Sequence, residues 1–230
     1  MKFGVYLNPK RIAAEKAVEY VKDGMIVGLG TGSTAEFAVR KIGQLVAGGL
    51  DIIGIPTSRQ TEKLAKECSI KLSTLDEHEK IDVTIDGTDE VDLDFNLIKG
   101  MGGALLWEKI VASNSKIEII VADNTKNVNI IGTKSPLPVE VVRFGWKTTS
   151  DKLKKLGCTP NIRVFGNAMY TTDSGNYILD CSFKPDGIKN AKELEQKINN
   201  IPGVVENGLF IDLTDIVITG SEKGMEIKKK

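Results

Sequence analysis

Short apolar runs that end near a glycine or an aspartate recur along the first half of the chain, and more polar stretches separate them. The runs occupy 25–30 (MIVGLG), 51–60 (DIIGIPTSRQ), 81–87 (IDVTIDG) and 116–126 (KIEIIVADNTK). Their lengths and bounding residues are typical of strands, whereas the intervening TGSTAEFAVRKIGQLV and TEKLAKEC favour helices. Three or four strand-then-helix units predict a mostly parallel sheet. Ligands of such a sheet bind beyond the carboxyl ends of its strands.

Two further segments belong to this half. Residues 9–22 place apolar side chains among charges and predict an amphipathic helix that ends at Asp23-Gly24. One helix is too little for a DNA-binding helix-turn-helix module. The run 70–75 (IKLSTL) is interpreted as another strand.

The pattern changes after Asn129. The predicted elements are strands at 135–142, 159–165 and 204–210, helices at 145–157 and 190–203, and a hairpin or broken strand at 167–183. This order resembles the split βαβ, ferredoxin-like arrangement. The run 215–220 favours a strand that returns to the first sheet, and 222–230 reads as a frayed, solvated tail.

We therefore predict an α/β fold, with a Rossmann-like, mostly parallel sheet and an inserted smaller ferredoxin-like α+β domain. The predicted boundaries are 1–132 plus 209–230 for the Rossmann-like catalytic domain and 133–208 for the smaller domain.

Composition narrows the class of protein. Among 230 residues, 31 Lys and Arg balance 31 Asp and Glu, so no basic field favours nucleic acid or an anionic membrane. The sequence shows no signal peptide and no apolar run of about 20 residues, which predicts a cytoplasmic protein. Cysteines 68, 158 and 181 form no CxxC pair and are expected to be free thiols. With His78 as the single histidine, a carboxylate or lysine is the expected base.

Residues 28–34 join a predicted strand to a predicted helix through glycines. Backbone N–H groups and the helix dipole can hold a phosphate at such a junction, and Thr31, Ser33 and Thr34 add hydroxyl groups. A dinucleotide site is one alternative, but GxGxxG requires a third glycine where the chain has Ser33. A turn that only lets helix and strand pack closely is the other alternative.

Residues 86–109 (DGTDEVDLDFNLIKGMGGALLWEK) gather acids, a lysine and glycines in one stretch. If residues 103–114 are helical, Glu108 shares its face with apolar side chains. Burial there would raise the pKa of Glu108, which suits a general base working near neutral pH. An ordinary exposed edge formed by Glu108 and Lys109 is an equally open alternative.

The acids of this stretch suit a polyhydroxylated ligand, because carboxylates accept hydrogen bonds from hydroxyl groups. Lys99 and Lys126 could balance a phosphate or a developing oxyanion, or be solvated at the surface. A solvated acidic loop and a hard-cation site stay open as well, although the spacing does not match the calcium loop DxDxDG.

Five motifs closely resemble the A-type ribose-5-phosphate isomerases: GLGTGSTA (28–35), DGTDEVD (86–92), KGMGGALLWEK (99–109), ADNTK (122–126) and PLPVEV (136–141). The resemblance covers nearly the whole chain. It implies an intramolecular oxidoreductase of the pentose phosphate pathway, interconverting ribose 5-phosphate and ribulose 5-phosphate without a required metal or cofactor. It also implies a Rossmann-like domain with a smaller α+β domain, assembled as homodimers or homotetramers, with no nucleic acid or membrane partner.

The resemblance also implies roles for single residues. Glu108 matches the catalytic glutamate, with Asp86, Asp89 and Lys99 as further catalytic groups. The implied substrate contacts are Thr31, Gly32, Ser33 and Thr34 in the first turn, Asp86, Gly87, Thr88 and Asp89 in the acidic loop, Lys99, Gly100, Met101 and Gly102 in the lysine-glycine loop, and Lys126.

Met101 departs from the family, which usually has glycine there, and its side chain would narrow the loop or alter its backbone. Two other classes stay open: a sugar-phosphate sensor that binds without chemistry, and a coenzyme A transferase whose glutamate carries an acyl group.

Overall fold

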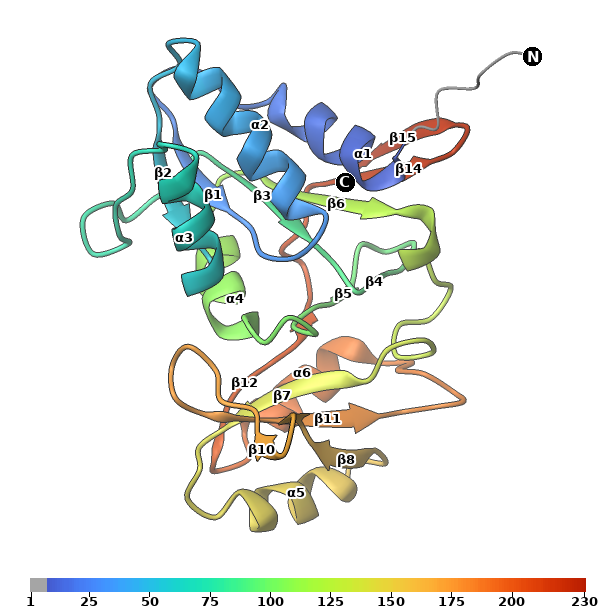
Figure 1. Cartoon of the computed structure of the whole chain (residues 1–230). Helices are drawn as coiled ribbons and strands as arrows, with labels where there is room; N and C mark the ends of the chain where they lie inside the picture. The colour runs from blue at the N-terminus through green and yellow to red at the C-terminus, as the bar shows by residue number, and fades with distance from the viewer. Residues whose placement is uncertain (1–7) are drawn as a thin grey trace. The chain divides into compact units, whose positions relative to one another are not determined.

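The computed structural model describes residues 8–230, which divide into two compact units (Figure 1). Unit 1 contains the residues through Gly87 together with Ile110–Lys126 and Leu213–Lys230, and unit 2 contains Thr88–Lys109 and Asn127–Asp212. Residues 88–109 therefore lie in unit 2. The predicted domain boundaries instead place this stretch in the Rossmann-like domain. The boundaries 1–132 plus 209–230 and 133–208 stay a prediction.

Unit 1 is built on a six-stranded sheet with the strand order β15-β14-β6-β3-β1-β2. The strands are β1 (Ile26–Leu29), β2 (Ile53–Pro56), β3 (Val83–Gly87), β6 (Glu118–Asp123), β14 (Ile216–Ser221) and β15 (Gly224–Lys229). All neighbours pair in parallel except β14 and β15, which are antiparallel. The mostly parallel α/β sheet and the return of the strand near 215–220 are confirmed.

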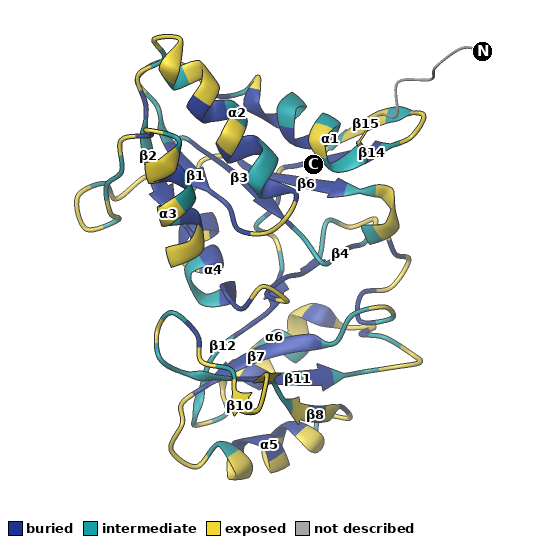
Figure 2. Ribbon diagram, viewed as in Figure 1, coloured by how far each residue is buried: buried dark blue, intermediate teal, exposed yellow. Residues whose placement is uncertain are grey.

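The helices of unit 1 pack on this sheet through small and branched side chains. They are α1 (Pro9–Val18), α2 (Ala35–Ala47) and α3 (Arg59–Glu67). Their buried residues, such as Ala13 and Ile42, form one cluster with strand residues such as Ile85. Figure 2 shows β1, β3 and β6 mostly in the colour of buried residues. α1 approaches β14 closely, because a Cβ on Gly220 would lie 1.9 Å from the carbonyl oxygen of Pro9.

Helix α4 (Leu105–Ser113) follows the central stretch and crosses from the residues of unit 2 into those of unit 1. Val111, in its unit 1 part, packs with Ile55 and Ile81 in a separate cluster.

Two expectations for this part of the chain are wrong. Residues 70–75 form no strand and contribute one isolated bridge, between Leu72 and Gly54. Residues 222–230 are not a frayed tail, because β15 pairs with β14 over six residues after a turn at Glu222-Lys223. Gly224 begins β15 with a φ of +129°, which favours glycine. The alternation of charged and apolar residues in Met225–Lys229 is typical of a half-exposed edge strand.

Unit 2 contains the predicted ferredoxin-like arrangement. Its elements are β7 (Leu137–Val141), α5 (Trp146–Lys154), β8 (Thr159–Ile162), β9 (Val164–Phe165), β10 (Ala168–Met169), β11 (Tyr177–Ser182), α6 (Ala191–Asn199) and β12 (Val204–Asn207). The main strands form an antiparallel sheet with the order β12-β7-β11-β8. Leu153 of α5 and Ile198 of α6 pack with sheet residues in one apolar core.

A small antiparallel sheet also belongs to unit 2, with the order β13-β5-β4. Its strands are β4 (Glu90–Val91), β5 (Leu97–Ile98) and β13 (Leu209–Phe210). Asp89 immediately precedes β4 and Lys99 immediately follows β5, so the sheet fixes the backbone at both residues. Within residues 8–230, no helix combines the length and apolar character needed to cross a membrane.

Candidate active site

The glycines of the junction between β1 and α2 serve two different purposes. A Cβ on Gly28 would lie 1.9 Å from the Thr84 hydroxyl oxygen, and one on Gly30 would lie 2.4 Å from Asp86 Oδ1. These two glycines let β1 lie directly against β3. Gly32 has a φ of +106° and nothing within 4 Å of a built Cβ, so it turns the chain and leaves open space beside it. Close packing explains the first two glycines but not the third.

Asp86 holds this turn in place from the end of β3. Its Oδ1 accepts hydrogen bonds from the N–H groups of Thr31 at 2.9 Å and Gly87 at 2.7 Å, and its side chain is buried. The Thr31 hydroxyl is buried as well and hydrogen-bonds three other hydroxyl groups, those of Thr57, Ser58 and Thr61. Thr31 and Asp86 therefore determine the shape of the turn.

The exposed part of the turn carries polar donors. Ser33 is exposed, and its hydroxyl accepts a hydrogen bond of 2.9 Å from the Lys10 ammonium group of α1. Thr34 stands at the N-cap of α2 without a side-chain capping bond. Backbone N–H groups at a helix start, next to a lysine, attract an anion. The sequence interpretation missed Lys10, because nothing in the pattern of 9–22 connects it with a residue 23 positions later.

The parallel pairing brings further candidates to the same edge of the sheet. β1, β3 and β6 are neighbours, with Leu29 opposite Ile85 and Gly87 opposite Val121. The turn after β1, Asp86-Gly87 and the 3-10 turn η1 (Asn124–Lys126) therefore all follow the carboxyl ends of adjacent strands. Lys126 is half-buried within η1.

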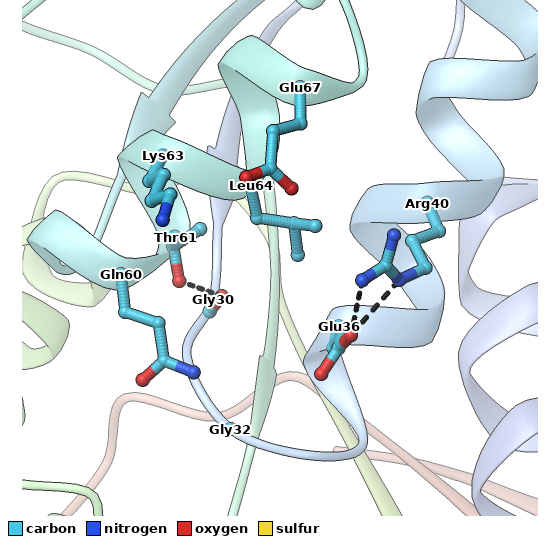
Figure 3. A pocket seen from close by; sticks show the side chains of 9 residues that line it. All are labelled: Gly30, Gly32, Glu36, Arg40, Gln60, Thr61, Lys63, Leu64 and Glu67. Carbon is cyan, nitrogen blue, oxygen red and sulfur yellow. Dashed lines mark hydrogen bonds and ion pairs between the residues drawn. The ribbon is translucent and has the colours of Figure 1, made fainter.

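A pocket of about 200 Å³ lies between α2 and α3, beside Gly30 and Gly32 (Figure 3). The Thr61 hydroxyl donates to the Gly30 carbonyl at 3.0 Å, and Arg40 pairs with Glu36. The charged side chains that line this pocket are Glu36, Arg40, Lys63 and Glu67. Two acids balance two bases, so this pocket offers no excess positive charge for a phosphate.

In unit 2, Lys99 and Glu108 form a buried ion pair. Lys99 Nζ lies 3.6 Å from Glu108 Oε1, and the side chains are 2% and 5% exposed. The Lys99 ammonium group also lies 5.3 Å from the centroid of the Phe210 ring. The alternatives of an exposed Glu108 edge and a solvated Lys99 are therefore wrong. The raised pKa of Glu108 stays a prediction.

The neighbours of Glu108 on α4 make different contacts. Lys109 is buried and pairs with Glu195 at 3.2 Å and Glu206 at 2.9 Å. Trp107 donates from its indole N–H to the Ser174 hydroxyl at 3.0 Å. Successive helix residues point about 100° apart, so Glu108 faces Lys99 while Lys109 reaches α6 and β12.

The lysine-glycine loop forms a closed turn at residues 100–103, called the 100–103 turn below. The Gly103 N–H donates to the Gly100 carbonyl at 2.9 Å, and these two glycines have φ values of +103° and +84°. Met101 is not at positive φ, its side chain is 42% exposed, and its N–H donates to Asp89 Oδ2 at 2.9 Å. A side chain is therefore tolerated at 101 without backbone strain.

Glu90 does not belong to a solvated acidic loop. Its side chain is fully buried and accepts hydrogen bonds from the backbone N–H groups of Gly132, Lys134 and Ser135. Within the described part of the chain, no cluster of three His, Cys, Asp or Glu side chains is arranged to hold a metal ion. Cys68, Cys158 and Cys181 are free thiols, as expected.

Comparison with known proteins shows the family of the chain. The family model described as ribose 5-phosphate isomerase A (phosphoriboisomerase A) matches residues 53–224. The chain belongs to the ribose 5-phosphate isomerase A family. A ribose-5-phosphate isomerase A from Gloeobacter violaceus is 51% identical, over 95% of this chain and 94% of the relative. Another, from Bacillus mycoides, is 46% identical over 96% and 99%.

Solved structures of the family share the fold. Ribose 5-phosphate isomerase A from Methanocaldococcus jannaschii has a TM-score of 0.91 and 42% identity, covering 96% of this chain and 98% of that one. A D-ribose-5-phosphate isomerase in complex with phospho-erythronic acid has a TM-score of 0.93 and 38% identity, covering 97% and 100%. These matches extend over both units, so family membership applies to the whole described chain.

Proposed function

We propose that the protein interconverts D-ribose 5-phosphate and D-ribulose 5-phosphate through a cis-enediolate, as an intramolecular oxidoreductase of the pentose phosphate pathway. The buried pair of Lys99 and Glu108 is the observation that carries this proposal. A carboxylate can move a proton between adjacent carbons, and a cation beside it stabilises negative charge on the neighbouring oxygen. Phospho-erythronic acid, which is bound in the structure of a relative, carries a phosphate at one end and a negatively charged carboxylate at the other. The enediolate of the proposed reaction likewise carries a phosphate at one end and a negative oxygen at the other.

The phosphate is assigned to the residues at the edge of the sheet in unit 1. Ser33, the start of α2 and the Lys10 ammonium group supply donors and positive charge, with Lys126 as a further cation. Lys10 is 2.9 Å from the Ser33 hydroxyl, so one anion could contact both. Binding the substrate through its phosphate lowers the entropic cost of the reaction.

Glu108 is assigned the proton transfer. Its carboxylate removes the proton from C2 of the open-chain aldose, and the electron pair of the C–H bond forms the enediolate. The same carboxyl group returns the proton to C1. The hydroxyl proton of the C2 oxygen passes to the negative C1 oxygen, so C2 becomes the ketone and C1 carries a hydroxyl group. Lys99 and backbone N–H groups of the 100–103 turn stabilise the negative oxygen. The reaction is redox-neutral overall and requires no cofactor or metal.

The two aspartates are assigned different tasks. Asp86 is 1% exposed and orders the turn through Thr31, whereas Asp89 is half-buried beside the 100–103 turn. We assign ring opening to Asp89, as the acid or base at the ring oxygen and anomeric hydroxyl. Gly87 and Thr88 join the two aspartates along the chain, and the Thr88 hydroxyl donates to the Ile98 carbonyl at 3.0 Å.

The test is Glu108→Gln, assayed for conversion of ribose 5-phosphate in the presence and absence of EDTA. Glu140→Gln is the matched control, because Glu140 is also a buried glutamate of unit 2, hydrogen-bonded to Thr172 and Asn176. Loss of a general base costs roughly 10² to 10⁴ in rate. We expect that loss for Glu108→Gln alone, with or without EDTA, and near-normal turnover would refute the assignment.

The same assay separates the other two classes of function. A sugar-phosphate sensor would bind ribose 5-phosphate and form no ketose with the unmodified protein. A coenzyme A transferase would form a thioester at a glutamate after incubation with an acyl-CoA, which mass spectrometry detects. Neither result is expected.

We infer further that the protein is cytoplasmic and forms homodimers or homotetramers, with a sugar phosphate as its small-molecule partner and no nucleic acid or membrane partner. Exposed apolar side chains of unit 2 support self-association: Phe144 is 93% exposed, Phe165 80% and Val164 61%. Light scattering after size exclusion measures the mass directly. A monomer at micromolar concentration would refute self-association.

A further inference from the structure

Arg163 makes several contacts with the 100–103 turn. It lies between β8 and β9, and its Nε and Nη2 donate to the two carboxylate oxygens of Asp180 on β11. Its Nη1 donates to the carbonyl oxygens of Gly100 at 2.9 Å and Met101 at 3.1 Å. The side chain is only 11% exposed. One guanidinium group thus connects the sheet of unit 2 with two consecutive peptide groups of the turn.

Tyr170 contacts the same turn from the end of the β9–β10 hairpin. Its hydroxyl donates to the Gly102 carbonyl at 3.4 Å, and its ring lies 5.8 Å from the Arg163 guanidinium carbon. A Cβ on Gly103 would lie 2.1 Å from the Tyr170 hydroxyl oxygen. The backbone N–H of Tyr170 donates to the Arg163 carbonyl, so the two side chains come from opposite ends of one hairpin.

These contacts determine where the N–H groups of the turn point. In a trans peptide the C=O and the following N–H point in opposite directions. Carbonyls of Gly100 and Met101 that face Arg163 therefore direct the N–H groups of Met101 and Gly102 away from it. The Met101 N–H reaches Asp89 at 2.9 Å on that opposite side. The orientation of the turn thus depends on the guanidinium group.

We propose that Arg163, held by Asp180, is a positioning residue for the isomerisation. It fixes the 100–103 turn so that Asp89, the turn's N–H groups and the adjacent Lys99 keep the orientation that the reaction requires. This inference rests on the function proposed above. Arg163 contacts the 100–103 turn through the carbonyls of Gly100 and Met101 and through the Met101 sulfur, which lies 3.8 Å from Nη2. In this proposal it supplies no proton and no charge to the reacting atoms.

Arginine suits this position for a geometric reason. The planar guanidinium group presents five donors in a fixed fork, which is enough for a bidentate carboxylate contact and two carbonyls at once. A lysine ammonium group keeps the charge but is a point donor with a different reach. Arg163→Lys therefore preserves the charge and removes the fork.

The experiment compares Arg163→Lys with Arg143→Lys in the full-length protein. Arg143 is a matched control, because it is also an arginine of unit 2 that donates to a backbone carbonyl, that of Gly175 at 2.6 Å, and stacks on a tyrosine, Tyr177. Three measurements are made on each variant: steady-state kinetics with ribose 5-phosphate, which give kcat and KM, inhibition by inorganic phosphate, and amide hydrogen exchange of the segment 99–106.

A misplacement of about 1 Å in catalytic groups costs roughly 100-fold in rate. We therefore expect Arg163→Lys to lower kcat about 10- to 100-fold. Amide exchange in 99–106 should become faster, while inhibition by inorganic phosphate should stay within about twofold of the unmodified protein. Arg143→Lys should leave all three unchanged. Asp180→Asn should reproduce the Arg163→Lys pattern, and the two changes combined should cost little more than either alone.

A kcat for Arg163→Lys within about threefold of the unmodified protein would overturn the proposal. It would also be overturned if inhibition by inorganic phosphate weakened by the same factor as kcat, because that result indicates general unfolding. The failure of the proposed function is recognised separately, because the unmodified protein would then form no ribulose 5-phosphate. Amide exchange still tests the contact in that case, and unchanged exchange in 99–106 would overturn it.

Discussion

Replacing Lys99 by methionine removes one charge of the buried pair and keeps a side chain of similar volume. Lys99 and Glu108 lie 3.6 Å apart and are 2% and 5% exposed, so water screens their interaction little. With an effective dielectric constant of about 20, two unit charges at that distance attract by about 5 kcal/mol. Removing one partner of a buried pair costs about 3 to 5 kcal/mol in the free energy of unfolding, because the other charge stays buried.

We therefore expect Lys99→Met to lower the free energy of unfolding by about 3 kcal/mol or more. Urea unfolding at pH 7.5 measures this value if the transition is two-state. The double variant Lys99→Met/Glu108→Gln should be more stable than Lys99→Met alone, since it leaves no unbalanced buried charge. If Lys99→Met costs under about 1 kcal/mol and the two changes are additive, the two groups do not interact as opposite buried charges.

Three further predictions concern other parts of the molecule. Lys10→Met should raise KM for ribose 5-phosphate about tenfold with little change in kcat, whereas Lys16→Met on the same helix should change neither, by initial-rate kinetics. Gly30→Ala should lower the melting temperature and the rate more than Gly32→Ala, because a Cβ on Gly30 meets Asp86 Oδ1 and the Ile85 carbonyl oxygen at 2.4 Å, whereas one on Gly32 is strained only by its φ of +106°. A larger effect of Gly32→Ala would contradict this packing. Burial raises the pKa of Glu140, so its contribution to stability is present below the unfolded value of 4.5 and is lost as pH rises through the folded pKa. Glu140→Gln should therefore raise the melting temperature at pH 7.5 more than at pH 4.5. An equal change in melting temperature at both pH values would contradict a pKa of Glu140 raised by burial.

Strands are predicted correctly from the sequence where an apolar run is also buried within a sheet of the fold. The apolar runs at 25–30 and 81–87 become neighbouring parallel strands because both faces of the sheet of unit 1 are buried there. The run 70–75 is equally apolar, but it contributes a single bridge. Periodicity alone does not distinguish such a segment from a strand.

Sequence alone groups the candidate site residues that lie in one local motif. Glu108 and Lys99 stand nine positions apart in one stretch, where the apolar neighbours of Glu108 left a buried acid and an exposed edge as two open alternatives. Lys10 and Arg163 were missed because their partners lie far away in sequence, at Ser33 and at the 100–103 turn. The burial of Glu90 could not be predicted from the sequence either, because only the fold brings three backbone N–H groups of residues 132–135 to its carboxylate.

The central claim is that Glu108 carries the proton between C2 and C1. The most direct test incubates ribose 5-phosphate in deuterium oxide with the unmodified protein, Glu108→Gln and Glu140→Gln, and follows deuterium at C2 of the aldose and C1 of the ketose by NMR. We predict ketose formation and deuterium incorporation with the unmodified protein and Glu140→Gln, and neither with Glu108→Gln. Deuterium incorporation by Glu108→Gln at an unchanged rate would contradict the account.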